Sequence, residues 1–366
     1  MPTVKDICKI IEKLAPTSYQ ESYDNAGLLV GDADMELTGV LLSVDITEEV
    51  VEEAIANNAN MVVAHHPIIF KGLKRLTGRN YVERTVIKAI QNNIALYASH
   101  TNLDSVQGGV NTKISEMLGL QDIHMLSTKK DNLLKLVSFV PVSHVETVNK
   151  ALFSAGCGHI GNYDKCSFNT KGLGTFRALD GTTPYVGKQN ELHKEEEIRT
   201  ETILPRHLLS QAIATLKTAH PYEEVAYDIY ELENEDPSVG IGCIGKLRES
   251  MPTKDFLEFV KDTFNLKVIR HTPLCKDKIS TVAVCGGSGS FLLENAKRAN
   301  ADIFITGDFK YHDFFDADRQ IIIADIGHYE SERCSMEIFN ELITENLPNF
   351  ATTFTKLDTN PINYFL

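Results

Sequence analysis

Two adjacent histidines, His65 and His66, stand where an apolar run of the chain ends at a proline. The residues NMVVA precede them, and Pro67 follows and cannot donate a hydrogen bond to a sheet ladder. Adjacent side chains on a regular strand point to opposite faces, so both imidazoles can serve one site only where the strand breaks. Ligands of α/β sheets lie at the carboxyl ends of strands. A lone histidine is more often structural, but this pair favours a metal or catalytic site.

Two further apolar runs end in a similar way. His100 follows IALYAS and precedes Asp104, and His328 follows IIIADIG and precedes Glu332. If a helix begins near residue 329, the second spacing places imidazole and carboxylate on one helix face. Asp104 alone would be interpreted as a turn or helix cap, and the pair His328 and Glu332 alone would be weak evidence. The recurrence at three strand ends favours one shared site.

The histidines and carboxylates at these three strand ends are too many for a single catalytic zinc, which takes three protein ligands and a water. Two ions about 3.5 to 4 Å apart, with one carboxylate bridging them, use three imidazoles and two carboxylates naturally. Such ligands admit Zn²⁺, Mn²⁺, Fe²⁺, Co²⁺ or Ni²⁺, with zinc as the first expectation. The predicted ligands of the two divalent ions are His65, His66, Asp104, His328 and Glu332.

Other residues near these strand ends are assigned supporting roles. His100 and Asp308 are expected to orient ligand side chains. Glu332 and His312 are the candidates for moving protons, although His312 is equally compatible with an ordinary polar loop. A glycine-rich stretch between a strand and a helix could cradle an anionic group of the substrate, or could form only a tight turn. Its glycines are Gly286, Gly287 and Gly289.

The elements that would position these residues alternate between strand and helix. Strand patterns cover residues 39–45, 60–66 and 94–100, and helix patterns cover 46–58 and 82–93. The alternation returns later in the chain, with strands at 280–286, 302–308 and 320–328 and a helix at 290–301. This order predicts an α/β fold with a parallel sheet.

The early and late parts of the chain align with each other in two segments, each without an internal gap. A shift of 242 positions lays His65 on Gly307, and a shift of 228 positions lays His100 on His328. Any two strand-helix-strand units share some likeness, but both copies end a strand with histidine, three residues and a carboxylate. This favours a duplicated α/β core, in which two halves of one sheet, related by pseudo-symmetry, bring the ligands together.

A stretch of different texture separates the two halves. The chain is expected to divide into a first half of the core at 1–127, an insert at 128–245 and a second half of the core at 246–366. The insert contains two β-α-β-like halves, which suit a small α+β ferredoxin-like domain. The linker back to the core is expected around Asp236 and Pro237.

Composition limits the classes of partner and location. The net charge of −14 opposes a phosphate backbone, so nucleic acid is not an expected partner, whereas an anionic small molecule could still bind next to metal cations. No apolar stretch reaches the roughly 18 residues of a membrane span, and the start lacks the features of a signal peptide. Seven scattered cysteines without a C-x-x-C pair indicate neither disulfides nor a thiolate zinc site. We therefore expect a cytoplasmic protein without a membrane partner.

Several of these motifs together resemble those of the NGG-interacting-factor-3-like family, whose members are often labelled GTP cyclohydrolase type 2 homologues. The matching motifs are AHHP, HTNLD, TGDFKYHD, GHYESE and DNAGLLVG, and the resemblance extends over essentially the entire chain. It implies a dinuclear metal site on the five ligands named above. The segments GHIGNYDKCSF, GLGTF and HPYEEVAYDIY resemble the insert of the longer bacterial members, which is similar to the PII and CutA ferredoxin-like fold. The family resemblance also implies a homo-oligomer, a ring-shaped hexamer built as a trimer of dimers.

Two functions of different classes follow from these observations. The first is a metal-dependent hydrolase that acts on a nucleotide-like or other phosphorylated small molecule, with GTP cyclohydrolase activity implied only by the family label. The second is a non-catalytic regulatory or assembly protein, in which the metals are structural or stored and the insert senses a small molecule.

Overall fold

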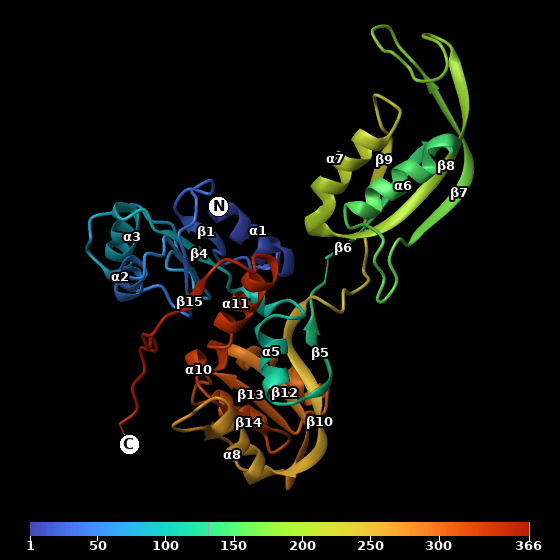
Figure 1. Cartoon of the computed structure of the whole chain (residues 1–366). Coiled ribbons are helices and arrows are strands. Elements are labelled where there is room, and N and C mark those ends of the chain that lie inside the picture. The colour runs from blue at the N-terminus through green and yellow to red at the C-terminus, as the bar shows by residue number, and fades with distance from the viewer. Residues whose placement is uncertain (131, 366) are drawn as a thin grey trace. The chain divides into compact units, whose positions relative to one another are not determined.

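The computed structural model describes residues 1–130 and 132–365, which form two compact units. Unit 1 consists of Met1–Thr128 and Pro237–Leu366, and unit 2 consists of Lys129–Asp236. The chain leaves unit 1 once and returns to it at the predicted linker (Figure 1). The predicted second boundary at residue 245 falls instead inside β10 (Gly240–Pro252), because that strand already pairs with strands of unit 1.

The first sheet of unit 1 has the strand order β1-β4-β3-β2-β15. Its strands are β1 (Gly27–Val30), β2 (Val40–Ser43), β3 (Met61–Ala64), β4 (Ala95–Ala98) and β15 (Thr352–Phe354). The connecting helices are α2 (Glu48–Ala56) and α3 (Tyr81–Gln91). The strands β15, β2, β3 and β4 run parallel, and β1 is an antiparallel edge. The predicted strand-helix alternation and parallel pairing of this half are confirmed.

The second sheet of unit 1 has the strand order β11-β14-β13-β12-β10-β5. Its strands besides β10 are β5 (Gln121–Thr128), β11 (Arg270–His271), β12 (Lys278–Ser288), β13 (Ile303–Gly307) and β14 (Ile322–Asp325). The strands β12, β13 and β14 are parallel, with α9 (Leu293–Arg298) between the first two. The expectation that both halves share one sheet is wrong. Each half forms its own sheet, and each sheet takes an edge strand from the other end of the chain, β15 in the first and β5 in the second.

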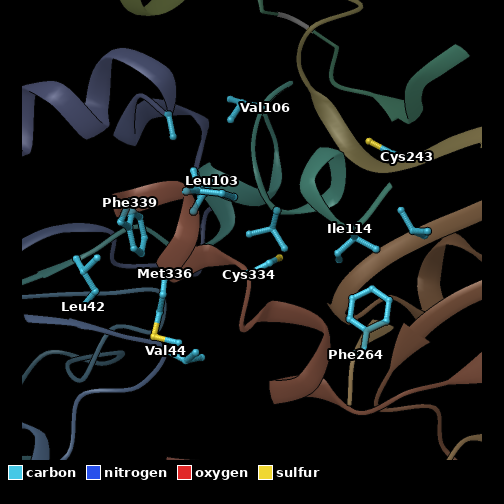
Figure 2. Packing of buried hydrophobic residues seen from close by; sticks show 14 of the residues in the cluster. Leu42, Val44, Leu103, Val106, Ile114, Cys243, Phe264, Cys334, Met336 and Phe339 are labelled. Atoms are coloured by element: carbon cyan, nitrogen blue, oxygen red, sulfur yellow. The ribbon is translucent and has the colours of Figure 1, made fainter. Parts of the chain in front are cut away.

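The core of unit 1 explains why the strands of both sheets are apolar on both faces. Alternate residues of β2 divide between two clusters, with Leu42 in a central cluster and Leu41 in a second cluster beneath α2 and α3. The second sheet divides in the same way, with Ile305 in the central cluster and Phe304 in a third one. Figure 2 shows the central cluster, where Phe339 of a helix packs near strand residues. The helices that supply this cluster are α1 (Val4–Leu14), α5 (Val110–Met117), α8 (Thr253–Thr263) and α11 (Ser335–Asn346).

Unit 2 is a four-stranded antiparallel sheet with two helices. Its elements follow the order β6 (Leu133–Pro141), α6 (Val145–Ser154), β7 (Ser167–Arg177), β8 (Leu192–Pro205), α7 (Leu209–Ala219) and β9 (Tyr227–Glu231). The strand order in the sheet is β7-β8-β6-β9. Both helices contribute to an apolar cluster with the sheet. In neither described part of the chain is there a helix whose length and apolar character would let it cross a membrane.

Candidate metal centre

The predicted ligands lie at the ends of three strands of unit 1. His65 and His66 follow β3, and the backbone N–H groups of both donate to the carbonyl oxygen of Val44, at 3.1 and 2.9 Å. The strand pattern is therefore broken here, as the sequence requires if both rings are to face one site. Asp104 ends the short helix α4 (Thr101–Asp104) that follows β4. The third pair occupies the first and last positions of α10 (His328–Glu332), which confirms the predicted helical spacing.

His65 and Asp104 contribute two buried atoms without partners. Nδ1 of the fully buried His65 lies 2.8 Å from the carbonyl oxygen of Ser99, so Nδ1 donates and Nε2 of the neutral ring keeps its lone pair. Nε2 lies 3.5 Å from Oδ1 of Asp104 and 3.6 Å from Oε1 of Glu332. Among the residues that the structure describes, neither Nε2 of His65 nor Oδ1 of Asp104 has a hydrogen-bond partner. Lone pairs that face one another in a dry site fit a shared metal cation.

His66 and His328 meet the other carboxylate oxygen of Glu332. Oε2 lies 2.8 Å from Nε2 of His66 and 3.0 Å from Nε2 of His328, and the two nitrogens are 3.3 Å apart. On the far side of each ring, Nδ1 lies 2.7 Å from a carboxylate, that of Asp45 for His66 and that of Asp308 for His328. Each Nδ1 therefore donates outward, so Nε2 is the ring nitrogen that faces the centre and that a bound cation would use.

Burial in one small space shifts the pKa values of acids and bases in opposite directions. Burial raises the pKa of Asp104 to about 6. Burial would also raise the pKa of Glu332, but the three surrounding histidines hold it well below its ordinary range. Burial would lower the pKa of His66, yet its hydrogen bonds to Asp45 and Glu332 raise it to about 10. The site thus favours positive charge beside its carboxylates, the charge that divalent ions would supply in place of protons.

His100 lies at the edge of this set. Its Nδ1 is 2.8 Å from Oδ1 of Asp24, and its ring centroid is 5.4 Å from those of His65 and His66. The geometry therefore allows direct coordination as well as the predicted orienting role. The ligand atoms fall into three groups, each within 4.8 Å: His65, Asp104 and Glu332; His66, His328 and Glu332; and His65, His66 and His100.

Two carboxylates of the site, Asp24 and Asp45, were missed by the sequence reasoning. Asp45 follows β2 directly beside the strand that bears the histidine pair, so a strand-end carboxylate was the available signal. Its second oxygen, Oδ2, accepts a 2.7 Å hydrogen bond from Thr359 near the end of the chain. Asp24 lies in a loop before β1, and apart from the family motif no pattern marks it.

Of the two roles considered for the glycine-rich stretch, an anion cradle and a tight turn, the contacts of Gly286 and Gly287 oppose the cradle. Two of its amides are already occupied, since Gly286 N–H donates to Asn111 and Gly287 N–H donates to Ser331. A Cβ on Gly287 would lie 2.1 Å from Oε1 of Glu332. Gly287 therefore makes room for the Glu332 carboxylate, and the amides of Gly286 and Gly287 are not free to cradle an anion. A Cβ on Gly289 would lie 2.4 Å from the side-chain hydroxyl of Thr306, so the glycine lets that side chain pack close to the backbone.

His312 lies apart from the groups just described. Its side chain is exposed, and its ring lies beside those of Tyr311 and Phe315, with centroids 5.2 and 6.5 Å away. It belongs to none of the groups of close ligand atoms found among the described residues. The structure thus brings together the five predicted ligands with His100 and Asp308, but it does not bring His312 among them.

Comparison with known proteins finds one family along nearly the whole chain. The family model Duf34/NIF3 (NGG1p interacting factor 3) matches residues 2–361. A protein of Halalkalibacterium halodurans named "GTP cyclohydrolase 1 type 2 homolog" is 41% identical over 88% of this chain and 87% of its own. The Bacillus subtilis protein of the same name is 35% identical over 98% of both chains. The crystal structure of a Bacillus cereus protein related to NIF3 has a TM-score of 0.86 at 39% identity, covering 100% of this chain and 99% of that one.

Proposed function

The chain belongs to the Duf34/NIF3 family, and on that premise we propose that it is a dinuclear metal-dependent hydrolase of a nucleotide-like or otherwise phosphorylated small molecule. The observation that supports this most directly is the pair of buried, partnerless atoms, Nε2 of His65 and Oδ1 of Asp104. Buried polar atoms normally have partners, and two electron-rich atoms at 3.5 Å call for a cation between them. The relatives' shared name suggests the substrate class.

Each carboxylate oxygen of Glu332 faces a different group of ligands. One ion would be held by His66, His328 and Oε2 of Glu332, and the other by His65, Asp104 and Oε1 of Glu332, so that this carboxylate bridges the two. Bound divalent ions would supply Lewis acidity, which lowers the pKa of water and polarises an electrophile. Borderline imidazole with carboxylate suits Zn²⁺, our first choice, and also Mn²⁺, Fe²⁺, Co²⁺ and Ni²⁺.

The residues around the ions orient ligands and move protons. Asp45 and Asp308 hold the Nδ1 protons of their histidines, which fixes the ring orientations. Glu332 uses both oxygens for binding, and His312 lies apart, so neither is well placed to transfer a proton. We assign that role to His100, whose Nδ1–H donates to Asp24 at the edge of the centre and whose other ring nitrogen would move the proton.

Metal counting in single variants tests the ligand assignment. The purified protein is loaded with Zn²⁺ or Mn²⁺, desalted and analysed for bound metal by mass spectrometry. We expect two ions per chain, about one ion in Asp104→Ala and in His328→Ala, and none in Glu332→Ala. Glu345→Ala, which changes an exposed carboxylate of α11, serves as the control and should keep both ions. A wild-type protein that keeps only one ion would overturn the dinuclear centre.

Turnover tests the reaction class separately. The protein loaded with Zn²⁺, Mn²⁺ or Fe²⁺ is incubated with a panel of nucleotides and phosphorylated metabolites, and we expect hydrolysis that is lost in His65→Ala while the oligomer stays intact. Loss of assembly or a large fall in melting temperature in His65→Ala, without turnover by the wild type, would instead support the non-catalytic alternative with structural metals.

Two finer features of the fold are also proposed. The β-α-β-β-α-β order of unit 2 and its β7-β8-β6-β9 sheet support a ferredoxin-like insert. The two sheets of unit 1 support a duplication, since each has three consecutive parallel strands with an antiparallel edge strand beside the third, β1 beside β4 and β11 beside β14. The hexamer and the cytoplasmic location stay predictions.

A further inference from the structure

Unit 2 contains a cavity of about 750 Å³ that has no part in the metal centre. Helices α6 and α7 pack on one face of its sheet, against residues that include Leu136 and Leu204. Phe139 and Glu197 are an odd number of positions away from these two on the same strands, so they lie on the opposite face and line the cavity. A volume of this size is typical of small-molecule sites.

The cavity contains a buried carboxylate, that of Glu197, which is only 8% exposed. Its Oε1 accepts a hydrogen bond of 3.0 Å from the hydroxyl of Tyr222. No salt bridge to Glu197 and no hydrogen bond to its Oε2 occur in the described parts of the chain. Burial raises the pKa of this carboxyl, and the negative charge of the neighbouring Glu195 adds to the rise. An unpaired carboxylate held in an apolar wall is costly, and a cationic ligand would remove that cost.

Strand β7 is shaped to accommodate this carboxylate. Gly172 and Gly174 pair with Glu197 and Glu195 and therefore share their face of the sheet. A Cβ on Gly174 would lie 2.1 Å from Oε2 of Glu197, whereas a Cβ on Gly172 would meet nothing within 4 Å. Gly174 thus leaves space for the carboxylate, and Gly172 leaves part of the cavity open.

Aromatic rings surround the same space. The ring of Tyr222 lies 6.1 Å from that of Phe176 and 6.2 Å from that of Tyr185, and all three line the cavity with Phe139. Aromatic faces attract cations, by about 0.5–1 kcal/mol at exposed sites and about 2 or more when water is excluded. Rings beside a carboxylate form the kind of environment that holds ammonium groups.

The basic residues around the cavity do not point to an anionic ligand. Nε of Arg199 lies 2.9 Å from Glu201, and its guanidinium lies over the ring of Phe139 at 5.9 Å. Nζ of Lys171 lies 2.7 Å from the exposed Glu196. Two of the three basic residues that line the cavity are thus paired with other carboxylates, and the third, Arg177, is exposed. The buried carboxylate would itself repel an anion.

We propose that this cavity binds a small organic cation, with an ammonium or guanidinium group against Glu197 and an apolar body against the aromatic rings. The site is independent of the metal centre and goes beyond the proposed hydrolase activity. It would give unit 2 a ligand of its own.

Choline is a suitable probe because 3,3-dimethyl-1-butanol has the same shape without the charge. Binding of each compound, and of benzoate as an anionic probe, to the full-length protein is measured by calorimetry and saturation-transfer NMR. We expect choline to bind at least tenfold more tightly than either comparison compound. This comparison uses only the wild-type protein, so it does not depend on whether a variant folds.

Three variants then locate the site. Glu197→Gln should weaken choline binding at least tenfold, and Gly172→Leu should block it by filling open space. Glu196→Gln removes a neighbouring carboxylate on the other face of β8 and should leave binding within twofold of the wild type. The proposal is overturned if choline does not bind, if the neutral or anionic probe binds as tightly, or if Glu197→Gln retains full affinity. A cavity filled by a second copy of the chain would appear as the first of these results.

Discussion

Gly287 offers a sharp test of how closely the metal centre is built against its surroundings. Its φ is +60°, and a Cβ there would lie 2.1 Å from Oε1 of Glu332 and 3.3 Å from Cε1 of His328. In Gly287→Ala the carboxylate must retreat by about 1 Å to restore ordinary contact, and because Glu332 belongs to both groups, both ions should be affected. Displacing a ligand, or losing a residue that orients it, lowers metal affinity about 10- to 100-fold, or by about 1.4–2.7 kcal/mol per ion.

The left-handed backbone by itself costs an alanine about 1–2 kcal/mol of folding stability, which must be separated from the effect on metal. Gly119→Ala is the matched control, since Gly119 has a φ of +66° and open space around its Cβ position. Metal affinity is measured by chelator competition, and stability by urea unfolding of the metal-free protein. Both variants should lose similar stability, and only Gly287→Ala should lose metal. Affinity within twofold of the wild type in Gly287→Ala, or an equal loss in Gly119→Ala, would refute the reasoning.

Three further outcomes are expected. Asp45→Asn should weaken metal binding about 10- to 100-fold in chelator competition with little change in fold, because it removes the charge that orients a ligand ring; unchanged affinity would contradict this. Hydrogen bonds from the backbone and side chain of Thr77 help to lower the pKa of Glu83 to about 2, so its carboxylate stabilises the fold above its unfolded pKa of about 4.5. The urea midpoint of Glu83→Gln should therefore fall below that of the wild type at pH 7, and the gap should narrow as the pH falls toward 2; a constant gap would count against the assignment. Of the seven free thiols only Cys166 and Cys275 are not buried, so a thiol reagent at pH 8 should modify two cysteines quickly and the rest only after unfolding.

Much of the candidate metal centre could be predicted because its side chains end apolar runs, and buried parallel strands are easily recognised as such runs. His65 and His66 end one run, and His328 ends another. The supporting residues were harder to find because their contacts come from distant parts of the chain. The partner of Asp45 on its far side is Thr359, and nothing local in either sequence marks that pairing.

The glycine-rich stretch shows why a local pattern can mislead. A strand followed by glycines and a helix is typical of anion-binding loops, and that pattern was the basis of the prediction. Whether this loop can bind an anion depends on Asn111 and Ser331, which lie on other elements. Their side chains accept the hydrogen bonds of the Gly286 and Gly287 amides. The same limit applies to the sheets. The strands of each half were predictable, but the exchange of β5 and β15 between the sheets depends on pairing between residues more than 100 positions apart.

The proposed duplication also accounts for the unequal contribution of the two halves to the site. Gly307 stands where the first half has His65, and a Cβ there would lie 2.9 Å from the carbonyl oxygen of Gly287 and from the backbone N of His328. A histidine at this position would therefore push apart the strand ends that present His328 and Glu332. The close backbone contacts at Gly307 therefore exclude a histidine pair from the second half. The second half gives up that pair, and its Asp308 instead orients His328 from outside the centre.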